Sequence, residues 1–151
     1  MEKPSLTIVP LTEDDLPELM DIERQIFPTP WSVNMMRQEL KNPNSYFYAL
    51  KNQENTLLGY GGFWKVVDEA HIISVGVRPE YQESGLGKKI VQYMLDVIGE
   101  LSLHFIYLEV RAGNEKAMNL YKKLRFVPLY VRKNYYTDTG EDAIIMGLTL
   151  D

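Results

Sequence analysis

The 151-residue sequence is 45% hydrophobic and 25% charged, which predicts a single domain, residues 1–151, with a core of its own. The lack of cysteine excludes disulfides and thiolate chemistry, and two histidines are too few for a zinc site, so we expect no metal. The net charge of −5 argues against general nucleic-acid binding, and no apolar run is long enough for a membrane span or a secretory leader, so we expect a cytoplasmic protein.

The first half of the chain is predicted to form a strand, two helices and three more strands. Thr12, with Asp15 three positions later, is a variant capping box, and the apolar residues that follow keep near-helical spacing up to Ile26. The prolines in residues 27–32 end this helix, and Ser32 caps a second, shorter helix. The acidic side chains of the early helix are expected to form a solvated face. The expected strands are residues 6–10, 45–51, 57–67 and 70–77, with a hairpin turn at 52–55.

The second half is predicted to alternate helices with strands. Residues 85–101 carry one apolar stripe, which is typical of an amphipathic helix. Because a strand, this helix and a further strand form a crossover unit, the middle of the sheet is expected to contain a parallel pair, with the other strands antiparallel. The remaining elements are strands at 104–112, 126–136 and 142–150 and a helix at 114–124. The predicted fold class is α/β, with a mixed sheet and helices on both faces.

Two glycines at the start of the helix at 85–101 have the chemistry of an anion-binding loop. In "YQESGLGKK", Gly85 and Gly87 let the backbone approach an anion, and the free N–H groups of the first helical turn point at it. The spacing matches neither a P-loop nor the dinucleotide fingerprint, whose third glycine would stand at Ile90. A plain tight turn that enters a helix is the alternative.

Several stretches carry a resemblance to one enzyme superfamily. Gln82-x-x-Gly85-x-Gly87 resembles the acyl-CoA pyrophosphate loop of the GNAT superfamily of N-acetyltransferases, and the element order is similar to that fold. More narrowly, "LEVRAGNEKAMNLY", "RKNYYTDTGEDAIIM" and "FPTPWS" resemble the RimI-type protein N-terminal acetyltransferases. The resemblance covers nearly the whole chain. It implies a mostly antiparallel central sheet with a splayed parallel pair, and acetyl-CoA as the cosubstrate.

The resemblance also implies which residues bind coenzyme A. Backbone groups of Val75, Gly76 and Val77 would pair with the pantetheine arm, although both valine side chains fit a plain core equally well. Asn114 would contact the arm, and this role is compatible with an ordinary helix N-cap. The residues implied for the pyrophosphate are Gln82, Glu83, Ser84, Gly85, Leu86, Gly87 and Lys88.

Two side chains are candidates for the proton transfers. Burying a carboxylate on an interior strand costs free energy unless the group is paired or has a catalytic role. Glu109 lies in such a strand. The resemblance implies that Glu109 accepts a proton; the alternative is a salt bridge to Arg111 or to a helix lysine. It likewise implies that Tyr121 donates a proton to the leaving thiolate, the alternative being a core aromatic. His71 is expected to be a strand-edge histidine.

The implied acceptor is the N-terminal amine of a protein, with a small-subunit ribosomal protein as the partner. A peptide α-amine has a pKa near ~8 and a lysine amine near ~10.4, so the α-amine is the easier one to deprotonate. Tyr135 and Tyr136 are expected to line the acceptor groove opposite Trp31, although simple packing of these loops is equally open. With neither a cysteine nor a serine triad, transfer is expected to be direct, in a ternary complex.

Three further points stay open in the sequence. The acceptor could be a lysine side chain or a small amine, and a non-catalytic acyl-CoA-binding module is a second alternative. The chain also departs from the family in "LRF", where Arg125 replaces the usual glycine. Glycine there supplies a left-handed helix ending, and a replacement costs about 1 kcal/mol.

Overall fold

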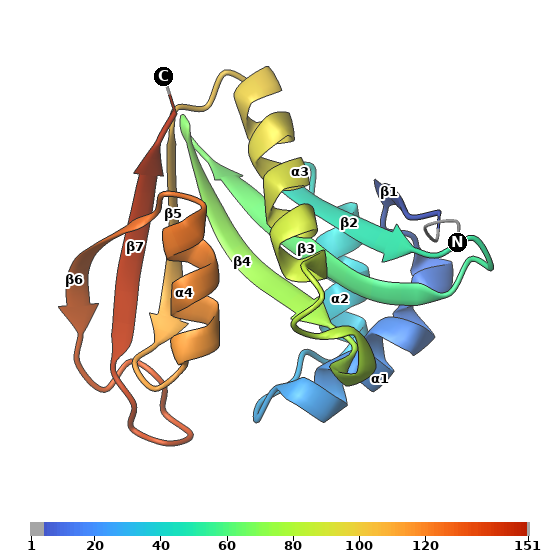
Figure 1. Ribbon diagram of the computed structural model, residues 1–151, viewed down its shortest axis with the longest axis horizontal. Coiled ribbons are helices and arrows are strands. Elements are labelled where there is room, and N and C mark those ends of the chain that lie inside the picture. Colours follow the sequence, from blue (N-terminus) through green and yellow to red (C-terminus); the bar gives the residue numbers. More distant parts are fainter. Residues whose placement is uncertain (1–4, 151) are drawn as a thin grey trace.

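The computed structural model describes residues 5–150 and contains seven strands and four α-helices in the predicted order (Figure 1). Two short 3-10 turns, Glu13–Asp15 and Pro79–Tyr81, are additional. The helices are α1 Leu16–Ile26, α2 Val33–Lys41, α3 Leu86–Glu100 and α4 Glu115–Lys123. The strands are β1 Thr7–Pro10, β2 Ser45–Lys51, β3 Leu57–Val66, β4 Glu69–Val77, β5 Phe105–Arg111, β6 Val127–Arg132 and β7 Ala143–Thr149.

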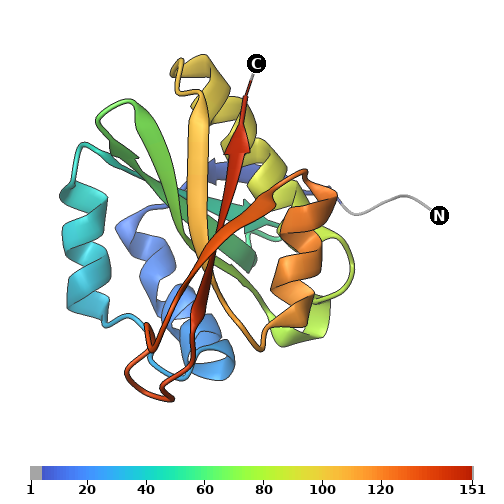
Figure 2. The same cartoon turned by 90° about the vertical axis from the view of Figure 1, so that its left-hand side faces the viewer.

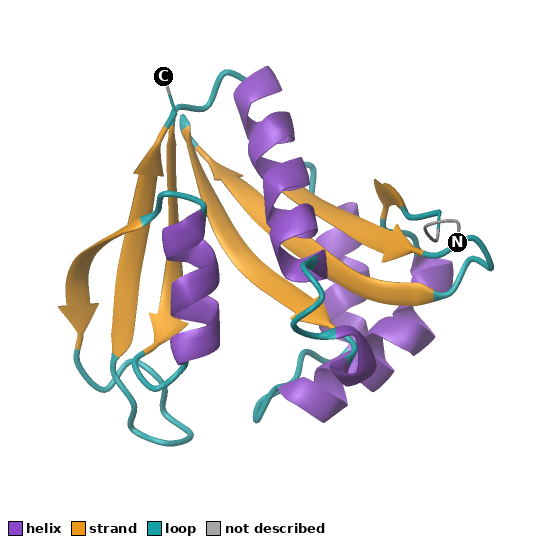
Figure 3. Ribbon diagram, viewed as in Figure 1, coloured by secondary structure: helices purple, strands orange, loops and turns teal. Residues whose placement is uncertain are grey.

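All seven strands form one mixed sheet, in the order β1-β2-β3-β4-β5-β7-β6. The predicted parallel pair is β4 with β5, and it is short: only Glu69–His71 pair with Phe105–Tyr107. Beyond these three pairs the two strands diverge, as the widening gap between their ribbons shows (Figures 1 and 3). The other strand pairs are antiparallel. The sheet is therefore continuous at one end and split at the other.

Helices cover both faces of the sheet, as predicted (Figure 2). On one face, α3 buries the stripe that its spacing predicts, and Tyr121 of α4 and the C-cap residue Leu124 belong to the same core. On the other face, α1 and α2 form a second core with side chains of β2 and β3. In both cores the helices contribute apolar residues at helical spacing. Burial of these apolar stripes holds the helices on the sheet.

The predicted signals at the helix ends are confirmed. Thr12 and Asp15 form a reciprocal capping box, and the Ser32 hydroxyl accepts a hydrogen bond from the Met35 N–H at 3.1 Å. The expectation of a solvated acidic face is wrong for two side chains. Asp15 is buried against Lys51, whose Nζ lies 2.6 Å from its carboxylate, and Glu23 is only 1% exposed. Among residues 5–150, no helix is long and apolar enough to cross a bilayer.

Candidate active site

The split between β4 and β5 opens onto two adjoining cavities. The tyrosine cavity, of about 400 Å³, is lined by Glu109, Tyr121, Tyr135 and Tyr136 together with Trp31 and neighbouring residues. The glycine-loop cavity, of about 620 Å³, is lined by the loop before α3 and by one side of α4. The two cavities share Ile26, Phe27, Val75, Asn114 and Ala117, so they form one continuous groove.

The glycine loop has the backbone geometry that an anion cradle needs. Gly85 is the N-cap of α3 and has φ +87°, and Glu83 two residues earlier has φ +64°. A Cβ on Gly85 would meet nothing within 4 Å, so the dihedral angle rather than crowding favours glycine here. Gln82 ties the loop to the sheet, since its Nε2 donates to the Val77 carbonyl at 3.1 Å. The free N–H groups at the start of α3 and the Lys88 side chain thus stand at the cavity wall.

Most residues expected to bind coenzyme A line the glycine-loop cavity. These are Val75, Val77, Gln82, Glu83, Gly85, Gly87, Lys88 and Asn114. Leu86 is an exception because its side chain is buried in the core, and Ser84 and Gly76 are not among the lining residues. Any contact of Leu86 with a ligand would therefore come from its backbone. The Asn114 side chain also caps α4, since its Oδ1 accepts from the Ala117 N–H at 3.1 Å.

Glu109 is paired, but with a partner that the sequence analysis did not anticipate. Its Oε2 lies 2.6 Å from Nε2 of His71, the last β4 residue of the parallel pair, whose partner Tyr107 stands two residues before Glu109. The alternative of a bridge to Arg111 or a helix lysine is wrong, because the ion pair that Glu109 forms is with His71. Arg111 is engaged with Asp138 and Glu141 instead. His71 is not at the edge of the sheet either, since β4 lies between β3 and β5. Glu109 thus lines the tyrosine cavity with its carboxylate held by an imidazole.

Tyr121 belongs both to the core and to the cavity. It is 8% exposed, its ring packs edge-on against Phe126 at 5.6 Å, and it lines the tyrosine cavity from α4. Burial raises the pKa of Tyr121 well above its ordinary value. The phenol therefore stays protonated at neutral pH, which is the state that a proton donor must have.

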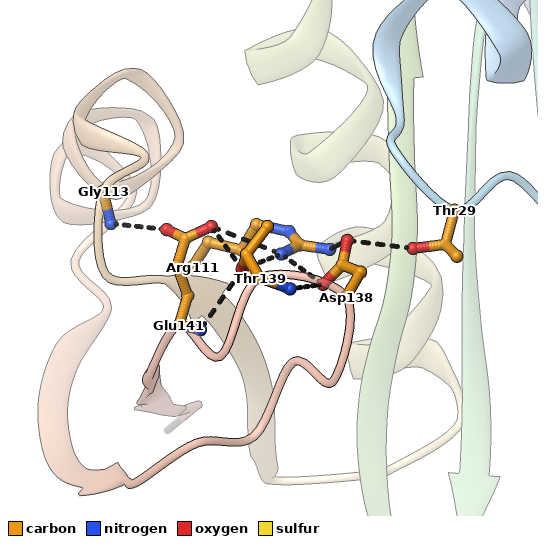
Figure 4. A network of polar contacts seen from close by, with 6 residues as sticks. All are labelled: Thr29, Arg111, Gly113, Asp138, Thr139 and Glu141. Carbon is orange, nitrogen blue, oxygen red and sulfur yellow. Dashed lines mark hydrogen bonds and ion pairs between the residues drawn. The ribbon is translucent and has the colours of Figure 1, made fainter.

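The two loops expected to face each other do meet, beside the tyrosine cavity. Arg111 at the end of β5 holds Asp138 in a bidentate pair, with Nη2 2.9 Å from Oδ2 and Nη1 3.1 Å from Oδ1. The Thr29 hydroxyl donates to the same carboxylate at 3.2 Å, joining the loop after α1 to the loop after β6 (Figure 4). The Arg111 guanidinium also lies 4.0 Å from the centre of the Tyr136 ring. Burial raises the pKa of Tyr136 to about 12, so this phenol is uncharged at neutral pH.

Glu23 is a lining residue of the tyrosine cavity that the sequence analysis assigned to a solvated face. Its Oε1 accepts the Trp31 N–H at 3.0 Å, and its Oε2 accepts a short hydrogen bond from the Tyr60 hydroxyl. Burial raises the pKa of Glu23 above its ordinary value. The spacing could have revealed this position, because residue 23 follows Leu19 by four on the buried stripe of α1. No spacing signal marks His71, whose partner is 38 residues away in the chain.

Comparison with known proteins agrees with this geometry. The model of the Acetyltransferase (GNAT) family matches residues 16–126, more than half of the chain. A Bacillus subtilis protein provisionally named a ribosomal protein bS18-alanine N-acetyltransferase is 36% identical over 139 residues, which are 91% of each chain. The Escherichia coli K12 ribosomal protein bS18-alanine N-acetyltransferase is 34% identical, over 95% of this chain and 97% of that protein.

The fold comparison gives the same result. The crystal structure of the ribosomal-protein-S18-alanine N-acetyltransferase from Escherichia coli superposes with a TM-score of 0.88 and 32% identity. The match covers 97% of this chain and 95% of that one, so the likeness extends over the whole α/β sheet and its four helices. By sequence and by fold, this chain belongs to the GNAT family of acetyltransferases.

Proposed function

We propose that this protein transfers the acetyl group of acetyl-CoA to the N-terminal α-amine of a protein, a small-subunit ribosomal protein in particular. One observation carries the proposal: Glu109 and Tyr121 line the same cavity, and that cavity continues into the one beside the glycine loop. A proton acceptor, a proton donor and an anion cradle thus lie along one groove.

Acetyl-CoA fits the chemistry of this groove. Its pyrophosphate would lie on the N–H groups at the start of α3, where Gly85 allows close approach and Lys88 adds positive charge. Its pantetheine arm would pair with the β4 backbone at Val75, Gly76 and Val77, in the part of β4 that has no pairing with β5. A backbone N–H of this stretch would stabilise the oxyanion that forms at the thioester carbonyl.

The transfer would be direct. The α-amine nitrogen attacks the acetyl carbon, the C–N bond forms, and the C–S bond breaks to release the thiolate of coenzyme A. Glu109 takes the proton that the amine loses, and Tyr121 gives its proton to the thiolate. The raised pKa of Tyr121 keeps it in the protonated form before transfer.

The nature of the acceptor rests on the relatives and on amine chemistry. Relatives that are 34% and 36% identical over more than nine tenths of this chain are named for alanine N-acetylation of ribosomal protein bS18. A carboxylate base also suits an α-amine, whose pKa near ~8 lies more than two units below that of a lysine amine. The loops that carry Trp31, Tyr135 and Tyr136 would form the walls against which the acceptor peptide lies.

A peptide panel tests the acceptor. Four peptides with the N-terminal sequence of bS18 would be compared: a free or blocked α-amine, each with or without an added lysine. The proposal predicts acetylation of both free peptides and neither blocked one. Equal rates with the blocked, lysine-containing peptide would contradict it and favour the lysine alternative.

Two variants test the residue roles. Glu109→Gln and Tyr121→Phe should each lower kcat by about a hundredfold to ten-thousandfold, the usual contribution of a general acid or base. Binding of acetyl-CoA, measured by calorimetry, should change little in both. Unchanged turnover in either variant would remove that residue from the mechanism.

A further inference from the structure

The carboxylate of Glu109 is held by one imidazole. Nε2 of His71 lies 2.6 Å from Oε2, and both side chains are about 15% exposed, at 15% and 16%. Among residues 5–150, no other side chain or backbone group donates a hydrogen bond to this carboxylate. Oε1 is therefore the oxygen left for a substrate in the tyrosine cavity.

The imidazole ring is itself fixed in place by aromatic contacts. It stacks on Tyr107 with the ring centres 4.4 Å apart and an angle of 13° between the planes. Trp64 meets it edge-on at 5.8 Å, and the Trp64 indole N–H is in turn held by Glu39 at 2.8 Å. These contacts hold the plane of the ring, in which Nε2 points at Glu109.

The second ring nitrogen is open to water. Within the described part of the chain, Nδ1 has no hydrogen-bond partner, and no side-chain polar atom there is both buried and unpaired. Nδ1 can therefore exchange protons with solvent, while Nε2 stays on the carboxylate.

We propose that His71 is a positioning residue for the proton acceptor, and that its charge state sets how strongly Glu109 acts as a base. The inference rests on the proposed role of Glu109. A neutral His71 donates its Nε2–H to Oε2 and orients the carboxylate so that Oε1 receives the amine proton. An imidazolium in the same place stabilises the carboxylate as an anion and weakens its pull on that proton.

This coupling has a consequence for the pH dependence of turnover. The substrate ammonium must lose a proton before transfer, and an imidazolium at His71 would weaken Glu109 as a base, so log kcat/KM should fall on the acid side more steeply than the slope of about one that the ammonium alone gives. The titratable side chains that meet the ring are Glu109 and Tyr107 on β5. Glu69 on β4 and Tyr130 on β6 lie near Tyr107, and Glu39 on α2 lies behind Trp64.

Two substitutions of His71 separate positioning from charge. His71→Gln keeps an N–H donor near Oε2 but cannot titrate, so kcat on the alkaline plateau should stay within about threefold while the acid slope falls to about one. His71→Leu removes the donor and should lower kcat by about tenfold to a hundredfold, the size of one hydrogen bond to a charged group. The exposed His104 gives the matched control, His104→Gln, which should change neither quantity.

The assay is steady-state acetylation of a free N-terminal peptide from about pH 5.5 to 9, with acetyl-CoA binding and circular dichroism as checks on folding. Adding His71→Leu to Glu109→Gln should cause no further loss, because His71 acts through Glu109. If His71→Leu fails to fold, the acid slope of His71→Gln alone tests the inference.

The outcomes separate this inference from the proposed function. Full activity of Glu109→Gln would overturn the proposed role of Glu109 itself. A steep loss in Glu109→Gln, together with an unchanged acid slope in His71→Gln, would leave that role intact and overturn the inference. A double variant that is much slower than Glu109→Gln would also overturn it, because His71 would then act independently.

Discussion

Helix α4 ends in a left-handed turn at Arg125, and replacing this residue with glycine is expected to stabilise the protein. The Arg125 N–H donates to the Lys122 carbonyl at 2.9 Å, and the Phe126 N–H donates to the Tyr121 carbonyl at 3.0 Å. These two hydrogen bonds form a Schellman motif, whose usual glycine is here an arginine with φ +75°. The same motif places the Phe126 ring against Tyr121, so the strained turn supports the proposed proton donor.

The expected gain follows from two opposing terms. A side chain in the left-handed region costs roughly 1–2 kcal/mol, which glycine removes. Glycine loses more conformational freedom on folding than arginine does, and this entropy loss reduces the stabilisation by about 0.5–1 kcal/mol. The net gain is about 0.5–1 kcal/mol, which for a chain of this length raises Tm by roughly 1–4 °C.

Thermal and urea unfolding of Arg125→Gly and Arg125→Ala measure this gain. Alanine removes the same charged side chain but keeps the Cβ that causes the strain, so it is the matched control. Only the glycine variant should be more stable than the parent, with kcat unchanged in both. If alanine stabilises as much as glycine, the gain comes from the loss of the arginine side chain, and the backbone explanation is refuted.

Three further predictions concern other parts of the structure. The raised pKa of Glu23 means that the folded protein holds the Glu23 proton more tightly than the unfolded chain does. The stability of the parent protein should therefore fall as pH rises above 4.5, the ordinary pKa of a glutamate. Glu23→Gln cannot lose this proton, so its stability relative to the parent should increase with pH in urea titrations between about pH 4 and 8. Gly76→Ala puts a Cβ 2.6 Å from the ring of Tyr60, the tyrosine that bonds Glu23, and should destabilise the folded protein by about 1–3 kcal/mol. Gly99→Ala lies in open space on α3 and should stabilise the folded protein by about 0.5–1 kcal/mol. Equal effects of the two substitutions would contradict the crowding at Gly76. Asp138→Asn weakens the ion pair with Arg111 beside the tyrosine cavity and should raise KM for the acceptor peptide by up to about fivefold, without changing KM for acetyl-CoA. A change in KM for acetyl-CoA alone would show that this ion pair does not shape the acceptor site.

The order of the elements could be predicted because it depends on local patterns. The stripe of α3, the capping box at Thr12 and the crossover from β4 to β5 each have a signal within a few residues, and all were confirmed. The length of the parallel pair could not be predicted in this way. It ends at His71 and Tyr107, and no local pattern in the sequence of either strand marks where the pairing stops.

In the candidate site, too, residues in local motifs could be predicted, whereas contacts between distant segments could not. Motifs found Glu109, Tyr121 and the glycine loop, and these line one groove. The partners of these groups were missed, because a pairing such as that of Glu109 with His71 depends on register between distant strands. Glu23 was missed for a different reason: its charge was taken as a sign of exposure, although its position on the helix is a buried one.

The central claim is that the α-amine of a protein N-terminus receives the acetyl group. The most direct test is mass spectrometry of bS18 incubated with this protein and acetyl-CoA, with fragmentation to locate the modified nitrogen. The account predicts a single added acetyl group on the first residue, lost when Glu109→Gln replaces the parent protein. Acetyl groups on lysine side chains, with the N-terminus left free, would contradict it.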